Sequence, residues 1–62
     1  MNKSTLESEA TEVTKLLSGK IISNIYRHRE TEVLIEFTDG TRLIIDKKEN
    51  GVELSITGGI SE

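Results

Sequence analysis

The 62-residue chain has no cysteine, no proline and no tryptophan, and only one histidine, one phenylalanine and one tyrosine. Without cysteine, a disulfide and a thiolate metal site are both excluded, and a single histidine is too few for a multi-histidine site within one chain. With so few aromatic residues, the core must be built from isoleucine, leucine and valine. We therefore expect no metal, no cofactor and no small-molecule substrate.

The short length and the net negative charge further restrict the classes of function that we expect. A single domain, residues 1–62, buries only about 60% of the surface of its unfolded chain, and domains of this size often gain stability by oligomerisation. A formal charge of -3 argues against a general nucleic-acid binder, which usually has a basic face. No apolar run approaches the roughly 20 residues of a membrane span. The first 13 residues lack the apolar segment of a secretory signal, so we expect a cytoplasmic protein.

An N-terminal helix is predicted over about residues 4–18. Ser4 and Glu7 match the S-x-x-E capping box, and Gly19 is a typical residue just after a helix end. The apolar residues recur at helical spacing and form one stripe. This stripe consists of Leu6, Ala10, Val13 and Leu17, widened by Leu16.

Four runs rich in β-branched residues follow, over about residues 20–27, 32–37, 41–48 and 52–57. The segments between them are too short for parallel crossovers, so the strands should form an antiparallel meander in the order 1-2-3-4. The predicted fold class is α+β, with one N-terminal helix packed on one face of a four-stranded antiparallel β-meander. The tail, residues 58–62, is predicted to be flexible.

The segment FTDGT predicts a hairpin whose turn fixes the strand register. A three-residue TDG loop, a type I turn followed by a left-handed Gly40, places Glu36 opposite Arg42 and gathers the large apolar residues on one face. A two-residue Asp-Gly turn instead moves Leu43 and Ile45 to the other face. We therefore favour the three-residue loop.

A second turn supports the same apolar face. Asn50-Gly51 is typical of a two-residue type I′ turn, and such a turn pairs Ile45 with Ile56. We call the face on which both turns agree the inner face, and we expect the helix to cover it with Leu6, Val13 and Leu17. The inner face carries Val33, Ile35, Phe37, Leu43, Ile45, Val52, Leu54 and Ile56.

The register of the first strand stays open. A four-residue loop that sets Arg27 opposite Glu32 favours the pair Ile22 with Tyr26 on the helix side, but the residues His28 to Thr31 are poorly suited to a tight turn. The alternatives for the pair that faces the helix are Ile21 with Ile25, or Ile22 with Tyr26.

The opposite side of the sheet, which we call the outer face, carries an apolar cluster among charges. Leu34 and Ile44 lie opposite each other there, and the first strand adds whichever pair it does not turn inward. A charge-rimmed apolar patch often marks an interaction site, so we expect a homodimer, or contact with another protein, through this face. The exposed edge of the last strand, Val52–Thr57, is a competing contact. The predicted contact residues are Leu34, Ile44, Ile25, Ile21, Glu36 and Arg42.

A regulatory nucleic-acid or phosphate-ligand binder is the alternative function. Its contacts would be Arg27, Arg29, Lys47 and Lys48, which the meander brings to one end of the sheet. Several acidic residues share that end, and stacking aromatics are scarce, so nucleic acid is the weaker hypothesis. His28 has no partner nucleophile, so we predict no catalytic residues and no enzyme. The strand–DGT–strand pattern, widespread in small bacterial β proteins, does not indicate a function.

Overall fold

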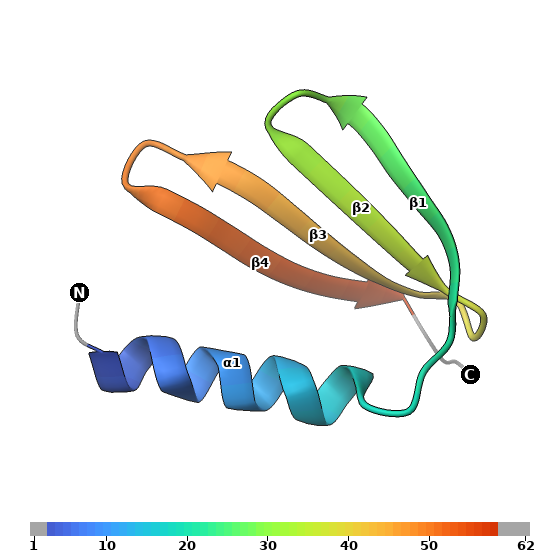
Figure 1. Cartoon of the computed structure of the whole chain (residues 1–62), viewed down its shortest axis with the longest axis horizontal. Coiled ribbons are helices and arrows are strands. Elements are labelled where there is room, and N and C mark those ends of the chain that lie inside the picture. The colour runs from blue at the N-terminus through green and yellow to red at the C-terminus, as the bar shows by residue number, and fades with distance from the viewer. Residues whose placement is uncertain (1–2, 59–62) are drawn as a thin grey trace.

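The computed structural model describes residues 3–58, with side chains from Thr5 onward. Helix α1 (Lys3–Leu17) precedes four strands, β1 (Ile22–Arg29), β2 (Glu32–Phe37), β3 (Thr41–Lys48) and β4 (Gly51–Gly58). The strands form one antiparallel sheet in the order β1-β2-β3-β4 (Figure 1). The α+β class and the meander are therefore confirmed. The predicted Ser4 capping side chain and the tail from residue 59 onward lie outside the described residues.

The helix ends as its sequence predicts, and a short linker then ties it to the sheet. Gly19 has a φ of 81°, and the Lys20 amide donates to the Leu17 carbonyl at 3.1 Å. Lys20 forms an ion pair with Asp39 in the β2–β3 turn, and the Thr38 amide donates to the Ile21 carbonyl at 2.8 Å. The linker is thus anchored at the end of the sheet where β2 turns into β3.

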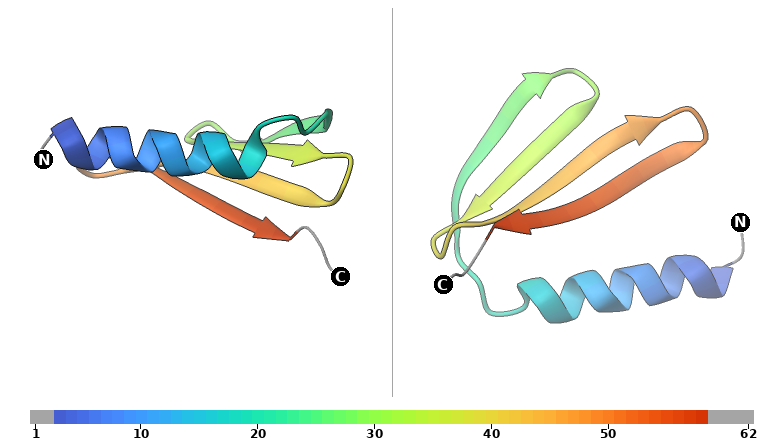
Figure 2. Two further views of the ribbon diagram at one scale, coloured as in Figure 1. Left: turned by 90° about the horizontal axis from the view of Figure 1, so that it is seen from below. Right: turned by 180° about the vertical axis from the view of Figure 1, so that it is seen from behind.

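From this anchor, α1 runs alongside β4 and does not cross the sheet (Figures 1 and 2). Among the described residues, no Cα atom of α1 lies within 8 Å of a strand Cα atom. Val13 and Leu17 are half-buried, whereas Leu6 and Leu16 are more than half exposed. The expected burial of Leu6 on the inner face is therefore wrong, and most of that face lacks the helical cover that we predicted.

The β2–β3 turn has the predicted form. Gly40 has a φ of 91°, and its amide donates to the Phe37 carbonyl at 3.0 Å. The Thr41 amide donates to Asp39 Oδ1 at 2.9 Å, so a side-chain hydrogen bond adds to the backbone hydrogen bond of the turn. The resulting register sets Leu34 opposite Ile44 on the outer face, as predicted. Lys20, followed by Thr41, holds the pKa of Asp39 well below its usual range because both donate to its carboxylate.

The β3–β4 turn differs from the prediction by one step. The turn residues are Glu49 and Asn50, and Gly51 already pairs with Lys48. A type I′ turn needs a positive φ at Asn50, but no non-glycine residue of the described chain has one. Ile45 consequently lies opposite Leu54. Each β3 residue thus pairs with a β4 residue two positions away from its predicted partner. Because side chains alternate with a period of two, the same residues still lie on the inner face.

Both alternatives for the first strand are wrong, because β1 contains a β-bulge that neither considered. Ser23 is the extra residue, and its hydroxyl donates to the Glu36 carbonyl at 3.2 Å. The bulge brings Ile22 and Ile25 to the same side of the sheet, whereas Tyr26 points to the other side. The loop to β2 has two residues, not four. The pairs that establish this register are Ile22 with Phe37, Asn24 with Glu36, Ile25 with Ile35, and Tyr26 with Leu34.

The core is small and lies at the anchored end of the sheet. Phe37 and Leu43, 7% and 9% exposed, are the buried apolar residues among those described. The accessible surface of 4695 Å² exceeds the value for a compact monomer of this mass, about 4,000 Å², by about 700 Å². The radius of gyration of 12.4 Å likewise exceeds the expected value of about 10.6 Å. The sheet is therefore a single layer with both faces largely open.

Candidate interaction surfaces

The outer face carries one apolar row that crosses the whole sheet. Tyr26, Leu34, Ile44 and Ser55 are successive cross-strand partners on β1 to β4. Leu34 and Ile44 are half-buried, and Tyr26 is exposed. Neighbouring side chains in the same layer therefore already shield the centre of this row.

The charged rim of this row is paired within the chain. Glu36 accepts hydrogen bonds from the Tyr26 hydroxyl and from Arg42 Nη2, each at 3.2 Å. The hydrogen bond to Glu36 raises the pKa of Tyr26, since the bond favours the protonated phenol. At the other end of the face, Lys48 lies 3.3 Å from both Asp46 and Glu53. These pairs compensate most of the charge around the row.

The structure brings together four of the six predicted contact residues. Leu34, Ile44, Glu36 and Arg42 are neighbours on the outer face, as the turn register requires. Ile25 is not among them, because the bulge places it opposite Ile35 on the inner face. Ile21 lies in the linker before β1. The apolar cluster on the outer face thus has three members, completed by Tyr26, and not the four that we expected.

The inner face is the larger apolar surface. Ile22, Ile25 and Val52 are 51%, 59% and 64% exposed, although all three lie in strands of the sheet. Lys47, the partner of Val52 near the β3–β4 turn, is a charged residue on this face. The half-buried apolar residues between them are Val33, Ile35, Ile45, Leu54 and Ile56.

An open groove of about 630 Å³ occupies the turn end of the inner face. Figure 1 shows the two hairpins diverging toward their turns, and the groove lies in this region. Its lining includes the apolar residues Val33, Ile45 and Val52 and, from the two turns, Glu30 and Glu49. The groove extends the exposed apolar surface to the far end of the sheet.

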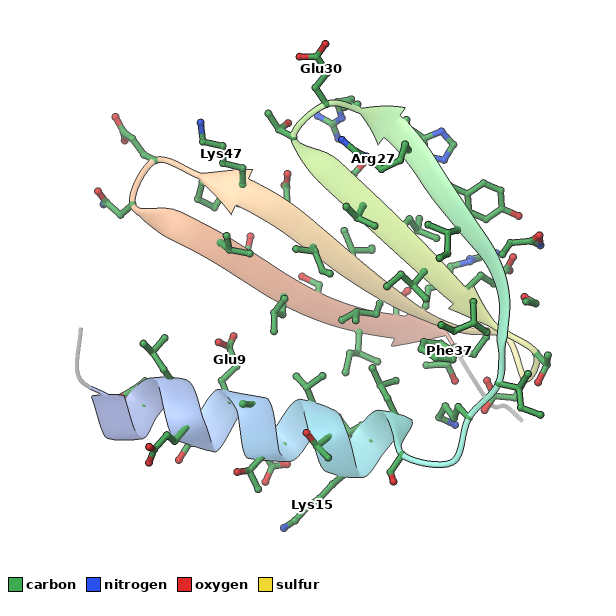
Figure 3. All side chains as sticks on the ribbon, in the orientation of Figure 1. Glu9, Lys15, Arg27, Glu30, Phe37 and Lys47 are labelled. Carbon is green, nitrogen blue, oxygen red and sulfur yellow. The ribbon has the colours of Figure 1, made fainter. Side chains whose placement is uncertain are left out.

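The predicted basic end is assembled, and three of its four basic side chains, those of Arg27, Arg29 and Lys48, are already engaged. Arg27 and Lys47 lie toward the same end of the sheet, on separate hairpins (Figure 3). Arg27 donates to the Glu32 and Glu30 carbonyls at 3.0 and 2.8 Å. Arg29 lies 3.5 Å from the Glu32 carboxylate.

A third basic residue of this end, Lys48, is held by carboxylates. Its ion pairs, first with Asp46 and then with Glu53, raise its pKa. Five acidic residues surround the four basic ones, so the end carries a formal charge of -1 (+4 and -5). The arrangement gives a phosphate ligand no concentration of unpaired positive charge. The acidic residues are Glu30, Glu32, Asp46, Glu49 and Glu53.

The single histidine, His28, lies against an aromatic neighbour. The His28 ring stacks on Tyr26, with ring centroids 5.7 Å apart and planes inclined by 6°. Within residues 3–58, no three histidine, aspartate or glutamate side chains are placed to hold a metal ion. In the same range, no helix is both long and apolar enough to cross a membrane.

Sequence reasoning missed the grouping of Ile22 with Ile25 on the inner face. The signal available was the polar pair Ser23-Asn24 between two apolar residues, which interrupts strict alternation where the bulge lies. Comparisons with protein-family models, with curated proteins and with solved structures gave no significant match. The interpretation of these surfaces therefore rests on their own chemistry.

Proposed function

We propose that the chain is a small protein–protein interaction module that acts as a homodimer or as a subunit of a larger assembly. The observation that carries this proposal is the open inner face, where Ile22, Ile25 and Val52 are more than half exposed. Antiparallel sheets commonly pack one face on a core and expose the other. Here α1 lies beside the sheet, so the apolar face is open to a contact with another molecule.

The extent of the surface supports the same proposal. The excess of about 700 Å² over a compact monomer is close to the roughly 800 Å² that each partner buries in a standard interface. Burial of apolar surface stabilises by about 25 cal/mol per Å², which is substantial for a domain with so small a core. Self-association would therefore supply the burial of apolar surface that a single-layer sheet lacks.

The two faces of the sheet compete for this contact, and the inner face has the stronger support. The outer contact predicted from the sequence stays a prediction, but its cluster has three apolar members and its rim charges are paired within the chain. The inner face has about ten apolar residues and few charges. Apolar area that is not screened by paired charges costs less to desolvate.

Two charge-neutral double variants separate the faces. Ile22→Glu with Ile25→Lys alters the inner face, and Leu34→Glu with Ile44→Lys alters the outer face. Sedimentation equilibrium at about 100 μM should give a dimer or larger species for the wild type and the outer variant, and a monomer for the inner variant. Far-UV circular dichroism confirms that each variant is folded.

Other results of this sedimentation experiment would lead to different conclusions about the contact. A monomeric wild type at this concentration contradicts self-association. Loss of the dimer only in the outer variant would transfer the contact to the outer face. An unchanged dimer in both variants would point to the β4 edge, where backbone groups and not side chains make the contact. Persistence of association in high salt supports an apolar contact, since ionic contacts weaken as salt rises.

A further inference from the structure

The N-terminal half of α1 carries apolar side chains that the sheet of its own chain does not cover. Leu6 is 51% exposed, whereas Val13 and Leu17, nearer the linker, are half-buried. Figure 1 shows α1 and β4 diverging toward the N-terminal end of the helix. Ala10 lies four residues after Leu6 and three before Val13, and therefore belongs to the same stripe. Helices in proteins gain most of their stability from packing such a stripe, so the N-terminal half of α1 has an unused packing surface.

A matching surface is open at the corresponding end of the sheet. The groove on the inner face is lined by the apolar residues Val33, Ile45 and Val52, and it lies where the two hairpins diverge (Figure 1). Val52 is 64% exposed. Among the described residues, no Cα atom of α1 lies within 8 Å of any strand Cα atom. One chain thus leaves both the groove and the N-terminal half of its helix uncovered.

The linker places the helix of each chain outside its own groove. The ion pair of Lys20 with Asp39 and the hydrogen bond from Thr38 to Ile21 hold the linker at the β2–β3 turn. From there α1 extends beyond β4, whereas the groove lies between the hairpins (Figures 1 and 2). The helix of a second copy is therefore better placed to enter the groove than the helix of the same chain.

Charged groups on the two surfaces are also complementary. Lys47 lines the groove, and Glu9 borders the apolar stripe, three residues from Leu6. Neither charge forms an ion pair within the part of the chain that the structure describes, and Figure 3 shows Glu9 on the sheet side of α1. At the turns, the groove is lined by Glu30 and Glu49. The first turn of α1 contains no acidic residue, and a helix N-terminus carries a partial positive charge.

These charges have similar spacings along the two elements. Glu9 lies six residues, about 9 Å, from the start of α1 at Lys3. Lys47 lies two residues, about 7 Å, from Glu49 in the β3–β4 turn. A helix that enters the groove with its N-terminus at the turns therefore brings its glutamate beside Lys47.

We infer that two copies of this chain exchange the N-terminal halves of their α1 helices. Leu6 and Ala10 of each helix pack in the groove of the other copy, and Glu9 forms an ion pair with Lys47 of that copy. This inference rests on the proposed self-association and specifies which residues make the contact. In a two-fold dimer the contact is made twice, because both subunits use the same surfaces.

The direction of the chain selects the symmetry axis. Helix α1 runs in the same direction as β4, with its N-terminus toward the β3–β4 turn (Figure 1). A two-fold axis parallel to the strands preserves this direction, so the helix N-terminus of one copy meets the turn end of the other. Helix α1 lies more than 8 Å beyond β4, and the boundary between β2 and β3 lies about 7 Å to the other side of β4. An axis close to β4 therefore places α1 over the groove. An in-plane axis perpendicular to the strands would bring the helix N-terminus to the end of the sheet away from the groove.

Because the chain has no cysteine, disulfide cross-linking can test the contact directly. Ala10→Cys and Val33→Cys are mixed in equal amounts and oxidised, and mass spectrometry separates the mixed disulfide dimer from the two homodimers. Thr11→Cys, on the opposite side of α1, replaces Ala10→Cys in the control mixture. The yield of mixed dimer should be at least about fivefold higher with Ala10→Cys, since a disulfide requires a Cβ separation of about 4 Å.

The double variant Ala10→Cys with Val33→Cys separates exchange from closure within one chain. Exchange predicts a disulfide-linked dimer on a non-reducing gel. A monomer that contains an internal disulfide would show that α1 covers the groove of its own chain, and this result would overturn the inference. Far-UV circular dichroism confirms that each variant is folded.

Charge reversal with mixing tests the ion pair. Glu9→Lys and Lys47→Glu should each raise the dimer dissociation constant about fivefold or more, because each reverses two symmetry-related pairs. An equimolar mixture should return to within about twofold of the wild type, since its mixed dimer has one wild-type pair and one pair with the charges exchanged. Glu7→Lys and Lys15→Glu make the same charge changes on other sides of α1 and should change the constant less than about twofold.

The failure of this inference can be told apart from that of the proposed function. Analytical ultracentrifugation of the full chain measures the dissociation constants. A dimeric wild type that gives neither the mixed cross-link nor the rescue on mixing would overturn the exchange of helices and leave self-association standing. A monomeric wild type would instead overturn the proposed function itself.

Discussion

The outer and inner faces of this sheet satisfy their side chains in different ways. On the outer face, Glu36 binds both Tyr26 and Arg42, and Lys48 binds two carboxylates, so polar groups find partners within the layer. On the inner face most residues are aliphatic, and their side chains have no polar groups that neighbours in the layer could satisfy. Polar groups can be satisfied by neighbours in a single layer, whereas apolar area needs a second layer to cover it. This difference is the reason why we propose the inner face, and not the outer one, as the contact surface.

Two adjacent residues of β3 give the sharpest comparison of the faces. Leu43 is 9% exposed on the inner face, and Ile44 is half-buried on the outer face. Leu43→Asp should lower the free energy of unfolding by more than about 3 kcal/mol, because it buries a charge without a partner. Ile44→Asp should cost only about 1 kcal/mol, since water reaches that position. Urea unfolding of both variants measures the difference, and equal losses would contradict the contrast between the faces.

The β2–β3 turn decides which residues belong to each face. Gly40 has a φ of 91°, in a region that β-branched residues rarely adopt. Gly40→Val should therefore lower the free energy of unfolding by more than about 1 kcal/mol. Nothing lies within 4 Å of a Cβ atom added at Gly40, so any loss reports backbone strain and not a clash. Thr38→Val, in the same turn, is a suitable control and should have a smaller effect.

A smaller effect is expected from the ion pair that anchors the linker. Lys20 holds the pKa of Asp39 well below its usual range, so the pair contributes stability above about pH 4. That contribution is lost as the pH falls below this value toward the pKa of the folded state. Asp39→Asn keeps an acceptor for the Thr41 amide but has no titratable group. The melting temperature of the wild type should therefore fall more steeply than that of Asp39→Asn between about pH 4 and pH 2. Parallel curves would show that the pair does not stabilise the fold.

The elements with the strongest local signals were predictable from the sequence. The TDG loop, with glycine at the position that needs a positive φ, fixed the β2–β3 register and therefore both faces of the central hairpin. The helix ended at its glycine, and β2 and β3 have the predicted bounds. Residues 52 to 56 kept their faces although the β3–β4 turn moved by one residue, because an even change of register preserves alternation.

The remaining errors came from features that depend on contacts between segments distant in the sequence. A β-bulge at Ser23 depends on how β1 meets β2, so alternation within β1 did not reveal that Ile22 and Ile25 share a face. The position of α1 depends on the linker anchor at Asp39, which joins residues 19 positions apart. An amphipathic stripe predicts that a helix needs a partner surface, but not whether that surface belongs to its own chain. The candidate site shifted from the outer to the inner face for these two reasons.

In the assembly that we propose, the bulges of β1 would also hinder growth by strand addition at the β1 edge. The register is interrupted between Ile22 and Asn24 and again between Tyr26 and Arg29, so the free edge offers only a short regular stretch of backbone donors and acceptors. A long flat edge can recruit strand after strand and polymerise, whereas an irregular edge resists such growth. Association through a two-fold face contact closes on itself. The same irregularity that brought Ile22 and Ile25 to one face therefore disfavours fibril growth of the proposed assembly at the β1 edge.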